Sequence, residues 1–497
     1  MKTLGGMPKT LGEIRKTRLE KLKRLNQSGF SGYPSETKRT HQVGEAIEGF
    51  KELATLKKEI VLAGRIKSLR THGKLTFLDI EDGSGKIQGL LRENNLGEKG
   101  YQFFLDHFDV GDFAELKGTL FETKTKEKTL DVTDFKIMSK SLRPLPEKWH
   151  GLQDVEERYR KRYLDLIMNP KVKEVFLKKS QVMKLLREYL DKQGFIEVKT
   201  PALQPIYGGA SAKPFVTHHN ILNIDLYLRI SDELYLKRLI VGGFEKVYEI
   251  CTDFRNEGID RWHNPEFTML EFYQAYANYK DLMKMTEQML SEIAKKTAGS
   301  LVVKYNEAKI DFKPPWKRVP YLEAFKTMAG IDLEEYSTFE SLKKLTEKKK
   351  MAVDFKTATD FPTLVDHLYK ELIRPKIVNP TFLIDHPYSM RPLAKRKAKS
   401  LDKVESFHLI AGGIELVNAY SELNDPQDQK TRWQEEMTRG KKGAKEYQVL
   451  DEDYIEALEY GMPPTAGWGM GVDRFCALLT DQHSIKDTIL FPTMKPK

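Results

Sequence analysis

The chain has 497 residues, with 82 lysines and arginines against 72 acidic residues, so its formal net charge is +10. Hydrophobic residues make up 40% and aromatic residues 10%, which is enough to build large cores and excludes wholesale disorder. The mean hydropathy is −0.53, and no apolar run approaches the roughly 20 residues that span a bilayer, which argues against a membrane protein.

Two cysteines, Cys251 and Cys476, stand apart and form no CxxC motif. This excludes a disulfide scaffold or a cysteine-rich zinc domain and favours a reducing compartment. The opening MKTLGGMPKT lacks the apolar core of a secretory signal. We therefore expect a cytoplasmic protein of about three domains, whose moderate positive charge permits a nucleic-acid partner.

Residues 1–48 are rich in lysine and arginine, and the segment at 13–25 has the spacing of a helix. Two interpretations stay open. The helix packs on another part of the protein, or it is a basic arm that lies against a phosphate backbone. The thin apolar stripe that packing would use consists of Ile14, Leu19, Leu22 and Leu25.

Residues 49–142 show the alternating pattern of short strands separated by glycine-containing turns. We expect a small five-stranded β-barrel, an architecture that often binds single-stranded nucleic acid through aromatic and basic side chains. Phe77 is the candidate stacking residue, although its spacing alone favours ordinary core packing. The expected strands cover residues 60–66, 75–80, 86–91, 113–121 and 129–138.

Residues 143–155 contain two prolines and few strand signals, which predicts a linker. From residue 156 onward helical and strand patterns alternate. The spacing predicts a helix over 171–193 that Gly194 would cap, and a second helix over 281–295. Between them, the segment FIEVKTPALQ predicts a strand that starts at Phe195 and ends at Pro201.

Three later segments carry more charge and glycine than packing requires. Residues 251–276 predict two strands joined by a charged loop, with Arg255 and Glu257 at one strand end and Phe267 on the return strand. This density of planar cations suits a polyphosphate. The second segment, 414–425, contains Glu415, Asn418 and Glu422. The third, GWGMGVDR at 467–474, has closely spaced glycines before Arg474 and matches neither GxGxxG nor a P-loop.

The motifs FRNEG…HNPEFTMLEFY and GWGMGVDR resemble motifs 2 and 3 of class II aminoacyl-tRNA synthetases, and GFIEVKTPALQ resembles motif 1. Two further segments, GGASAKPFVTHHN at 208–220 and SELNDPQDQ at 421–429, are similar to the lysyl-tRNA synthetase family. The resemblance extends over nearly the whole chain.

This resemblance implies an α+β multidomain protein. A basic helical arm (1–48) would precede an OB-type anticodon-binding barrel (49–142), a linker (143–155) and a class II catalytic domain (156–497) with an antiparallel sheet flanked by helices. It implies ATP-dependent activation of L-lysine to lysyl-adenylate and transfer to the 3′ end of tRNA(Lys), with release of AMP and pyrophosphate. Motif 1 implies a homodimer.

The resemblance also assigns roles at the nucleotide. Arg255 would hold the α-phosphate and the substrate carboxylate, and Glu257 would accept from the adenine amino group. Phe267 and Arg474 would enclose the adenine ring. The implied ATP-binding set is Arg255, Glu257, Arg261, His263, Asn264, Phe267, Glu415, Gly471 and Arg474, of which Arg255, Glu257, His263 and Arg474 would be catalytic.

For the amino acid, acidic side chains would complement the two ammonium groups of lysine, and a neutral amino acid would leave a buried carboxylate unpaired. Glu233 and Glu271 would meet the α-ammonium, and Glu422 and Tyr273 the side-chain ammonium. The implied lysine-binding set is Gly209, Glu233, Arg255, Glu271, Tyr273, Asn418 and Glu422.

The implied Mg²⁺ site departs from the family pattern. Glu415 would bind the ion, but the second glutamate, expected seven residues earlier, is His408. Histidine prefers softer metals than Mg²⁺. Three interpretations stay open: His408 ligates the metal, His408 is packed while Glu415 and Glu422 bind the metal, or the alignment is shifted by one. Arg391 also replaces the family's usual serine.

In the barrel, the resemblance favours a stacking role for Phe77 over core packing. The implied anticodon-binding residues are Arg65, Phe77, Gln88 and Glu127.

Rival interpretations remain. An aspartyl- or asparaginyl-type synthetase shares the motifs, but its pocket would hold basic residues rather than Glu233, Glu271 and Glu422. A paralogue that lysylates a protein would typically lack the barrel. A catalytically weakened RNA-binding or regulatory protein is suggested by His408. The residues that argue against it are Arg255, Glu257, Glu415 and Arg474.

Overall fold

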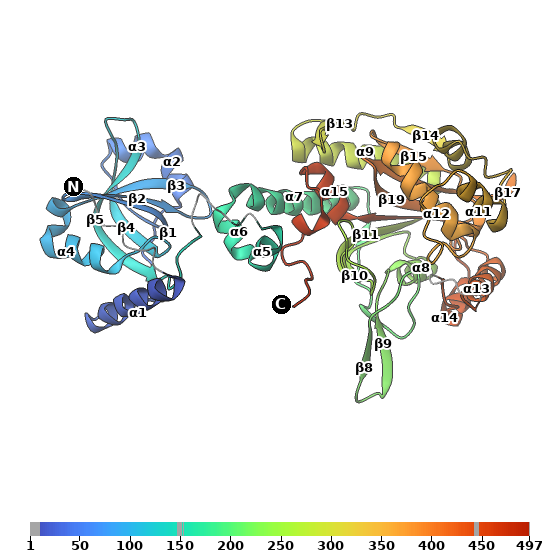
Figure 1. The fold of residues 1–497 in the computed structure, drawn as a ribbon, viewed down its shortest axis with the longest axis horizontal. Coiled ribbons are helices and arrows are strands. Elements are labelled where there is room, and N and C mark those ends of the chain that lie inside the picture. The colour runs from blue at the N-terminus through green and yellow to red at the C-terminus, as the bar shows by residue number, and fades with distance from the viewer. Residues whose placement is uncertain (1–9, 147–151, 153, 442–446, 497) are drawn as a thin grey trace. The chain divides into compact units, whose positions relative to one another are not determined.

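The computed structural model describes residues 10–146, 152, 154–441 and 447–496. The chain divides into two compact units, residues 1–151 and 152–497, which are coloured blue to cyan and green to red in Figure 1. The first nine residues of the expected basic arm lie outside the described residues, as do residues 147–151 and 153 of the expected linker.

The first unit contains a closed five-stranded barrel in the order β1-β2-β3-β5-β4. Inward-facing side chains such as Leu62, Leu78 and Leu116 alternate with outward polar ones and form its core. The expected barrel is therefore confirmed. Its strands are β1 (Glu59–His72), β2 (Leu75–Glu81), β3 (Lys86–Arg92), β4 (Phe113–Glu122) and β5 (Lys128–Ser139).

Helices cover the barrel. Helix α4 (Glu93–His107) connects β3 to β4 and was not predicted, because Gly97 and Gly100 weaken its helical pattern. Gly97 has a φ of 71° and kinks the helix. Two short helices, α2 (Val43–Glu48) and α3 (Phe50–Thr55), precede β1.

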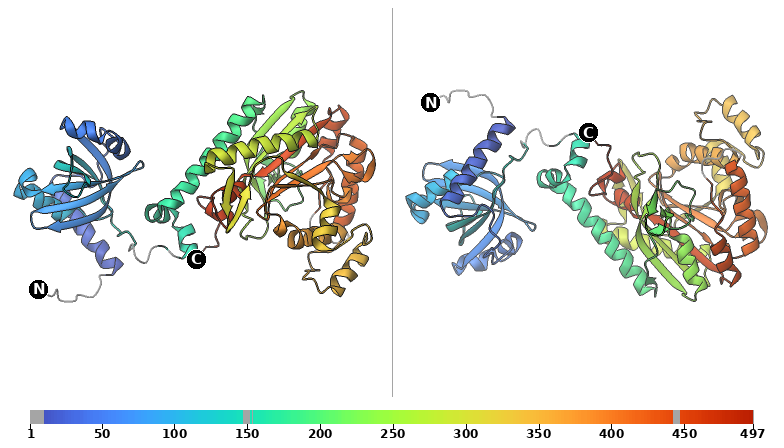
Figure 2. Two further views of the ribbon diagram at one scale, coloured as in Figure 1. Left: turned by 90° about the horizontal axis from the view of Figure 1, so that it is seen from above. Right: turned by 90° about the horizontal axis from the view of Figure 1, so that it is seen from below.

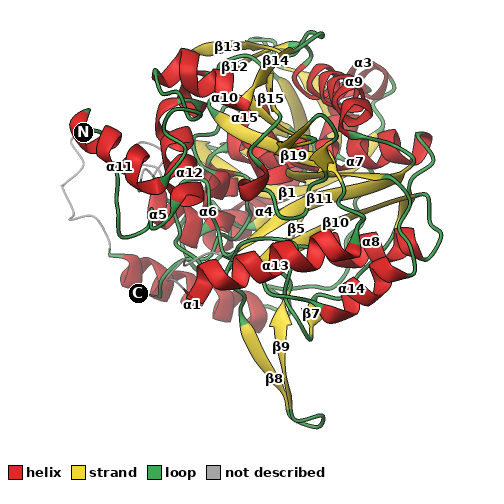
Figure 3. Ribbon diagram, turned by 90° about the vertical axis from the view of Figure 1, so that its right-hand side faces the viewer, coloured by secondary structure: helices red, strands yellow, loops and turns green. Residues whose placement is uncertain are grey.

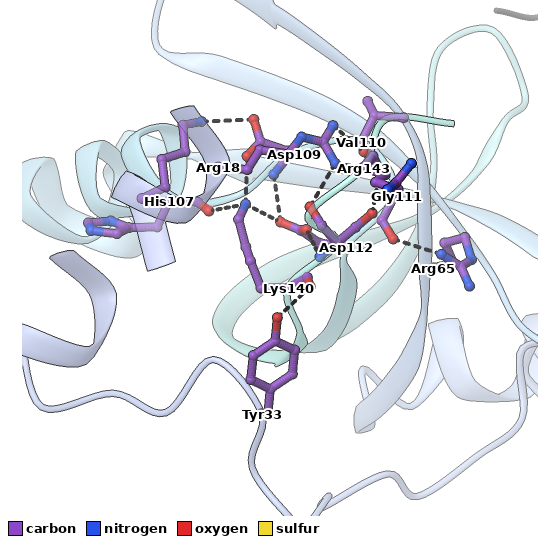
Figure 4. Close-up of polar contacts among 12 residues, drawn as sticks. Arg18, Tyr33, Arg65, His107, Asp109, Val110, Gly111, Asp112, Lys140 and Arg143 are labelled. Atoms are coloured by element: carbon purple, nitrogen blue, oxygen red, sulfur yellow. Dashed lines mark hydrogen bonds and ion pairs between the residues drawn. The ribbon is translucent and has the colours of Figure 1, made fainter. Parts of the chain in front are cut away.

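Helix α1 (Leu11–Gln27) begins with a capping box formed by Thr10 and Glu13. Leu22 and Leu25 pack against the barrel core. Arg18 is buried and donates to the carbonyl oxygens of Ser141 at 2.8 Å and Val110 at 2.9 Å (Figure 4). The helix therefore packs on its own unit, while Arg15, Lys16, Lys23 and Arg24 remain exposed.

A buried lysine anchors the chain just after β5. Lys140 Nζ is fully buried and lies 2.7 Å from Asp112 Oδ2 and 2.7 Å from the His107 carbonyl oxygen (Figure 4). Asp109 also accepts from Lys140. A buried ammonium ion is tolerated when its donors are satisfied in this way. The arrangement holds the loop between α4 and β4 in place.

The second unit is built on an eight-stranded sheet in the order β14-β15-β18-β19-β20-β11-β10-β6. Only the pairs β14–β15 and β6–β10 are parallel, so the expected antiparallel architecture is confirmed. The strands are β14 (Lys317–Pro320), β15 (Thr381–Ile384), β18 (Ser406–Ala411), β19 (Ile414–Ser421), β20 (Thr465–Gly471), β11 (Glu266–Ala275), β10 (Lys246–Phe254) and β6 (Ile196–Glu197).

One face of this sheet is covered by three helices, α7 (Pro170–Lys192), α9 (Tyr279–Ala298) and α15 (Val472–Leu479) (Figure 2). Leu186 of α7 and Leu290 of α9 pack with Trp468 of β20 in the main core. Helices α7 and α9 confirm the two predicted helices, and Gly194 follows α7 with a φ of 80°.

The remaining elements surround the sheet (Figure 3). The helices are α5 (Val155–Arg160), α6 (Arg162–Met168), α8 (Glu233–Val241), α10 (Tyr321–Ala324), α11 (Phe339–Lys348), α12 (Phe361–Leu372), α13 (Pro426–Lys441) and α14 (Glu452–Glu459). The strands are β7 (Leu203–Gln204), β8 (Val216–His219), β9 (Ile224–Leu228), β12 (Val302–Tyr305), β13 (Ala308–Asp311), β16 (Arg396–Lys397) and β17 (Ser400–Val404).

The predicted strand from Phe195 to Pro201 was too long, since β6 comprises only Ile196 and Glu197 at the sheet edge. Nearby, the β8–β9 hairpin projects from the second unit (Figures 1 and 3). Among the helices of the described ranges, none is long and apolar enough to cross a bilayer.

Candidate active site

A polar row crosses the middle of the large sheet. Glu271 on β11 lies opposite Gly469 on β20, which lies opposite Asn418 on β19, which lies opposite His408 on β18. Directly opposed residues of an antiparallel sheet point to the same face. This face is the one away from the core, because the alternate residue Trp468 packs into the core. A cavity of about 400 Å³ opens over the row.

At one end of the cavity lies a buried group of charges. Glu233 opens α8, and Lys237 follows one helical turn later. Lys237 Nζ donates to Glu233 Oε1 at 2.7 Å and to Glu422 Oε2 at 2.8 Å. Tyr420 Oη also donates to Glu233 Oε1, at 2.8 Å. The second oxygen of Glu422, Oε1, has no hydrogen-bond partner within the described residues.

Glu271 and Tyr273 extend this group along β11. Tyr273 Oη donates to Glu271 Oε2 at 2.8 Å, and Ser231 Oγ donates to Glu271 Oε1 at 3.1 Å. Gly467 faces them from β20, where an added Cβ would lie 2.0 Å from Glu422 Oε1 and 2.5 Å from Tyr273 Cε1. Only glycine fits at this position.

When its carboxyls are ionised, the pocket has an excess of negative charge, with Glu233, Glu271 and Glu422 against the single ammonium of Lys237. Burial and then Glu233 raise the pKa of Glu271 to about 8. Burial raises the pKa of Glu422 to about 8, although Lys237 opposes the shift. Burial alone would lower the pKa of Lys237, but Glu233 and Glu422 outweigh it and raise that pKa well above its ordinary value. A cationic ligand would compensate the excess.

A second cavity, of about 180 Å³, adjoins the first. Arg255 follows β10, and its guanidinium lies 5.1 Å from the centroid of the Phe267 ring on β11, as the predicted strand–loop–strand requires. Arg474, in the first turn of α15, lies across from them with its Nη2 3.3 Å from His263 Nε2. The lining includes Arg255, Glu257, His263, Asn264, Phe267, Glu415, Gly471 and Arg474.

Arg255, Glu415, Asn418 and Arg474 line both cavities. Two ligands bound in the two cavities would therefore be adjacent beside the guanidinium groups of Arg255 and Arg474 and the carboxylate of Glu415. Of the expected nucleotide residues, Arg261 alone lines neither cavity. Its side chain is exposed, and its carbonyl oxygen accepts from Ile485 N at 2.9 Å.

Comparison with known proteins agrees with this geometry. Residues 154–495 match the tRNA synthetases of class II (D, K and N), and residues 60–138 match the OB-fold nucleic acid binding domain. A lysine–tRNA ligase of Pelotomaculum thermopropionicum is 48% identical over 492 residues, covering 99% of this chain and 97% of its own length. The lysine–tRNA ligases of Carboxydothermus hydrogenoformans and Clostridium tetani are 48% and 49% identical, covering 98% and 93% of this chain and 99% and 92% of their own lengths.

The chain belongs to the lysine–tRNA ligase family of class II tRNA synthetases.

At the expected metal position of this family, Glu415 and His408 lie together, with Glu415 Oε2 3.3 Å from His408 Nδ1 and accepting from Tyr369 Oη at 3.2 Å. A third side chain, Arg391, places its Nη2 3.2 Å from His408 Nδ1 and in direct contact with Nε2. Burial, and then Arg391, lower the pKa of His408 well below its ordinary value, so the ring is neutral.

The donor set therefore fits one Mg²⁺ ion at Glu415, and the position expected to hold the second metal-binding carboxylate is occupied by His408. The expected metal role of Glu422 is incompatible with the structure. Glu422 lies seven residues beyond Glu415 along and just past β19, which corresponds to about 23 Å of extended strand. Because Mg²⁺–oxygen distances are about 2.1 Å, the two carboxylates cannot bind the same ion.

A further acidic cluster lies behind Glu271, where carboxylate oxygens of Asp232, Asp253 and Glu271 come within 4.8 Å of one another. Arg229 pairs with Glu249 beside it at 2.8 Å. Both oxygens of Asp232 lack a partner among the described residues. Burial, and then Glu271 and Asp253, raise the pKa of Asp232 well above its ordinary value, which favours a protonated carboxyl.

In the first unit, Phe77 is half-buried on the outer face of β2 and takes no part in the barrel core. Its cross-strand neighbour on β1 is Arg70. Gln88 lies opposite Asp79 on the same face, and its Oε1 accepts from Thr129 Oγ1 at 3.1 Å. Thr129 also donates to the Glu127 carbonyl oxygen. The outer face of β1, β2 and β3 therefore carries Arg70, Phe77 and Gln88.

Arg65 is placed differently. It pairs in register with Glu81, donates to the Gly111 carbonyl oxygen at 2.9 Å and lies 4.2 Å from the Phe113 ring centroid (Figure 4). Arg65 is therefore far along β1 from Phe77, and a one-residue register shift between Ile66 and Ser68 pairs Phe77 with Arg70 rather than with Leu69. Sequence reasoning missed Arg70 because this shift leaves no signal in the residue pattern.

Three other side chains at the site were missed. Lys237 lies within an apolar helical run. Its four-residue spacing from Glu233 is typical of an ion pair on one helix face and could have identified it. Tyr420 lies two residues after Asn418 on β19 and therefore points to the same face of the sheet. Arg374, after α12, lines the first cavity together with Arg391.

Proposed function

We propose that this protein activates L-lysine with ATP to form lysyl-adenylate and transfers the lysyl group to the 3′ end of tRNA(Lys), releasing AMP and pyrophosphate. The observation that carries the substrate assignment is Glu422 Oε1, which is buried beside Tyr273 without a hydrogen-bond partner among the described residues, in a pocket with three carboxylates and one ammonium. The side-chain ammonium of lysine would supply the missing donor.

The same charges disfavour the amino acids used by related enzymes. An aspartate side chain would add a carboxylate to Glu233, Glu271 and Glu422, and asparagine would leave the excess charge uncompensated. Sites built on buried polar complements discriminate by roughly 10⁴-fold or more. Lysine satisfies the pocket by charge and by length.

Activation requires attack of the lysine carboxylate on the α-phosphorus of ATP, which forms a carbon–oxygen–phosphorus linkage and expels pyrophosphate. The nucleophile is already ionised, so no general base is needed, and catalysis depends on alignment and charge stabilisation. Arg255 can contribute to both alignment and charge stabilisation because it lines both cavities. Phe267 and Arg474 would enclose the adenine, and Glu257 would accept from its amino group.

Glu415 would hold Mg²⁺, which when bound neutralises phosphate charge. In the second step a terminal ribose hydroxyl of tRNA attacks the lysyl carbonyl, the carbon–oxygen bond to the phosphate breaks, and AMP leaves with the bonding electron pair while its phosphate oxygen takes the hydroxyl proton. Arg255 can hold the departing phosphate in this step as in the first.

We assign tRNA binding to the first unit. Phe77 would stack on an anticodon base, with Gln88, Glu127 and Arg65 as further contacts and Arg70 beside the ring. The exposed basic side chains of α1 favour a phosphate backbone. With α1 packed on its unit, Leu22 and Leu25 of its apolar stripe are used for packing, Leu19 is exposed, and its basic face remains available.

We also propose a homodimer in the cytoplasm. Four apolar side chains on β6, β7 and the β8–β9 hairpin are exposed, namely Ile196, Leu203, Val216 and Ile221, the last of which is 90% exposed. A surface of this kind favours a second copy of the chain. Both cysteines are free and buried, which suits a reducing compartment.

The test is ATP–pyrophosphate exchange with Mg²⁺ and lysine, aspartate, asparagine or no amino acid. Exchange with lysine alone is expected. Exchange with aspartate or asparagine would contradict the substrate assignment. A folded protein that binds tRNA but supports no exchange would favour the regulatory alternative, for which the site itself offers no support.

A further inference from the structure

The corner of the cleft beside Glu415 is lined by protein cations. Arg391 follows a short 3₁₀ turn, Tyr388–Met390, and Arg374 follows α12, and both line the first cavity together with Glu415. Neither Arg391 Nε nor Arg374 Nε has a hydrogen-bond partner among the residues that the structure describes. Guanidinium groups with unused donors beside a nucleotide cleft are suited to phosphate oxygens.

The position of Arg391 is fixed from two sides. Its carbonyl oxygen accepts from Arg432 Nη1 at 3.3 Å, and Arg432 is itself held by Asp428 at 2.8 Å. At the other end, Nη2 contacts the His408 ring. His408 is buried in β18 and packs against His386 with ring centroids 4.5 Å apart. A long side chain held this way loses little further freedom when it binds a ligand.

These contacts also decide what His408 does. Arg391 donates to the lone pair of Nε2, and the other ring nitrogen, Nδ1, lies 3.3 Å from Glu415 Oε2, where the N–H of the neutral ring can donate. No lone pair is then left for a divalent ion, and the charge of Arg391 repels such an ion. The family pattern predicts a metal-binding carboxylate here, and the structure instead holds an arginine supported by a histidine.

We propose that Arg391, positioned by His408, is a protein-borne cation that binds the outer phosphates of ATP and pyrophosphate, so that this enzyme uses Glu415 and a single Mg²⁺ at this corner. The proposal rests on the proposed function, because it names the phosphate contact of that same site. Arg391 would bind substrate directly, whereas His408 is a positioning residue.

The first experiment measures binding, not turnover. Arg391→Met keeps the chain length and removes the charge, Arg391→Lys keeps a charge, and Lys344→Met, an exposed change on α11, is the control. Binding of inorganic pyrophosphate and of L-lysine is measured by calorimetry with Mg²⁺. Arg391→Met should weaken pyrophosphate binding at least about tenfold, and Arg391→Lys should restore part of it. Lysine binding should be unchanged in both.

The second experiment restores the family pattern by combining Arg391→Ser with His408→Glu. In wild type, pyrophosphate binding should saturate non-cooperatively with Mg²⁺, and in the double variant it should become steeper as a second ion binds. Unchanged pyrophosphate binding in Arg391→Met, or equal loss of pyrophosphate and lysine binding, would overturn the proposal. These assays need no amino acid activation, so failure of lysine-dependent exchange alone would refute the proposed function and not this contact.

Discussion

Lys237 and Glu422 form a fully buried ion pair of 2.8 Å that occupies only one of the two carboxylate oxygens of Glu422. The pair holds the carboxylate in place and leaves Oε1 directed at the space beside Gly467 and Tyr273. Lys237 thus positions an acceptor for a second ammonium.

Glu422→Gln should raise the KM for lysine about 100-fold or more while changing ATP affinity less than about twofold, because an amide cannot pair with two ammonium groups. Steady-state exchange and ATP calorimetry measure the two quantities. Glu459→Gln, an exposed change at the end of α14, is the matched control. An unchanged lysine KM in Glu422→Gln would refute its role.

Lysine affinity should rise with pH between about 6 and 8. Glu271 and Glu422 have pKa values of about 8, so both are largely protonated at neutral pH and must lose protons to pair with an ammonium ligand. Affinity should increase up to tenfold per pH unit for each proton released. Calorimetry in buffers of different ionisation enthalpy should detect the release, and a pH-independent affinity would contradict it.

Phe77→Ala and Arg70→Ala should each reduce the kcat/KM for tRNA charging by about tenfold or more and leave lysine-dependent exchange unchanged. Stacking of one base on an aromatic ring contributes about 1–3 kcal/mol. Leu56→Ala, an exposed apolar change in the same unit, is the control. Equal losses in both assays would mean that Phe77 or Arg70 supports the fold instead.

Asp232→Asn should stabilise the protein at pH 8 and have little effect at pH 4. Because the folded-state pKa of Asp232 is raised, folding retains a proton that the unfolded chain releases, so this group costs stability as pH rises above about 4. An asparagine avoids that cost, of about 1–3 kcal/mol. Urea unfolding at the two pH values measures it, and equal midpoints for both proteins at pH 8 would contradict the prediction.

The barrel strands and the two long helices were predictable because each shows its own period, two residues for a strand such as β2 and 3.6 for α7. Arg255 and Arg474 were also predictable, since Arg255 directly follows β10 and Arg474 lies in the first turn of the helix that follows β20. The pairing of strands that lie far apart in the sequence was not predictable. The row that joins Glu271 to His408 depends on strand order, which the residue pattern of a single strand does not contain.

The contacts of charged side chains were the least predictable. Nothing local indicates that Arg391 reaches His408, 17 residues later, or that Lys237 reaches Glu422, 185 residues later. The metal-binding role predicted for Glu422 is wrong for the same reason. Its spacing from Glu415 suggested a pair of metal ligands, but the extended course of β19 keeps the two carboxylates apart.

Gly467 constrains how this pocket can diverge. A Cβ at that position would overlap Glu422 Oε1 and Tyr273, so the three positions form one unit of variation. A lineage that changes its amino acid preference must alter at least two of them in concert, and any single step passes through a protein whose pocket is blocked or uncompensated. A change of substrate through single substitutions is thus hindered, because the pocket depends on the missing side chain of Gly467.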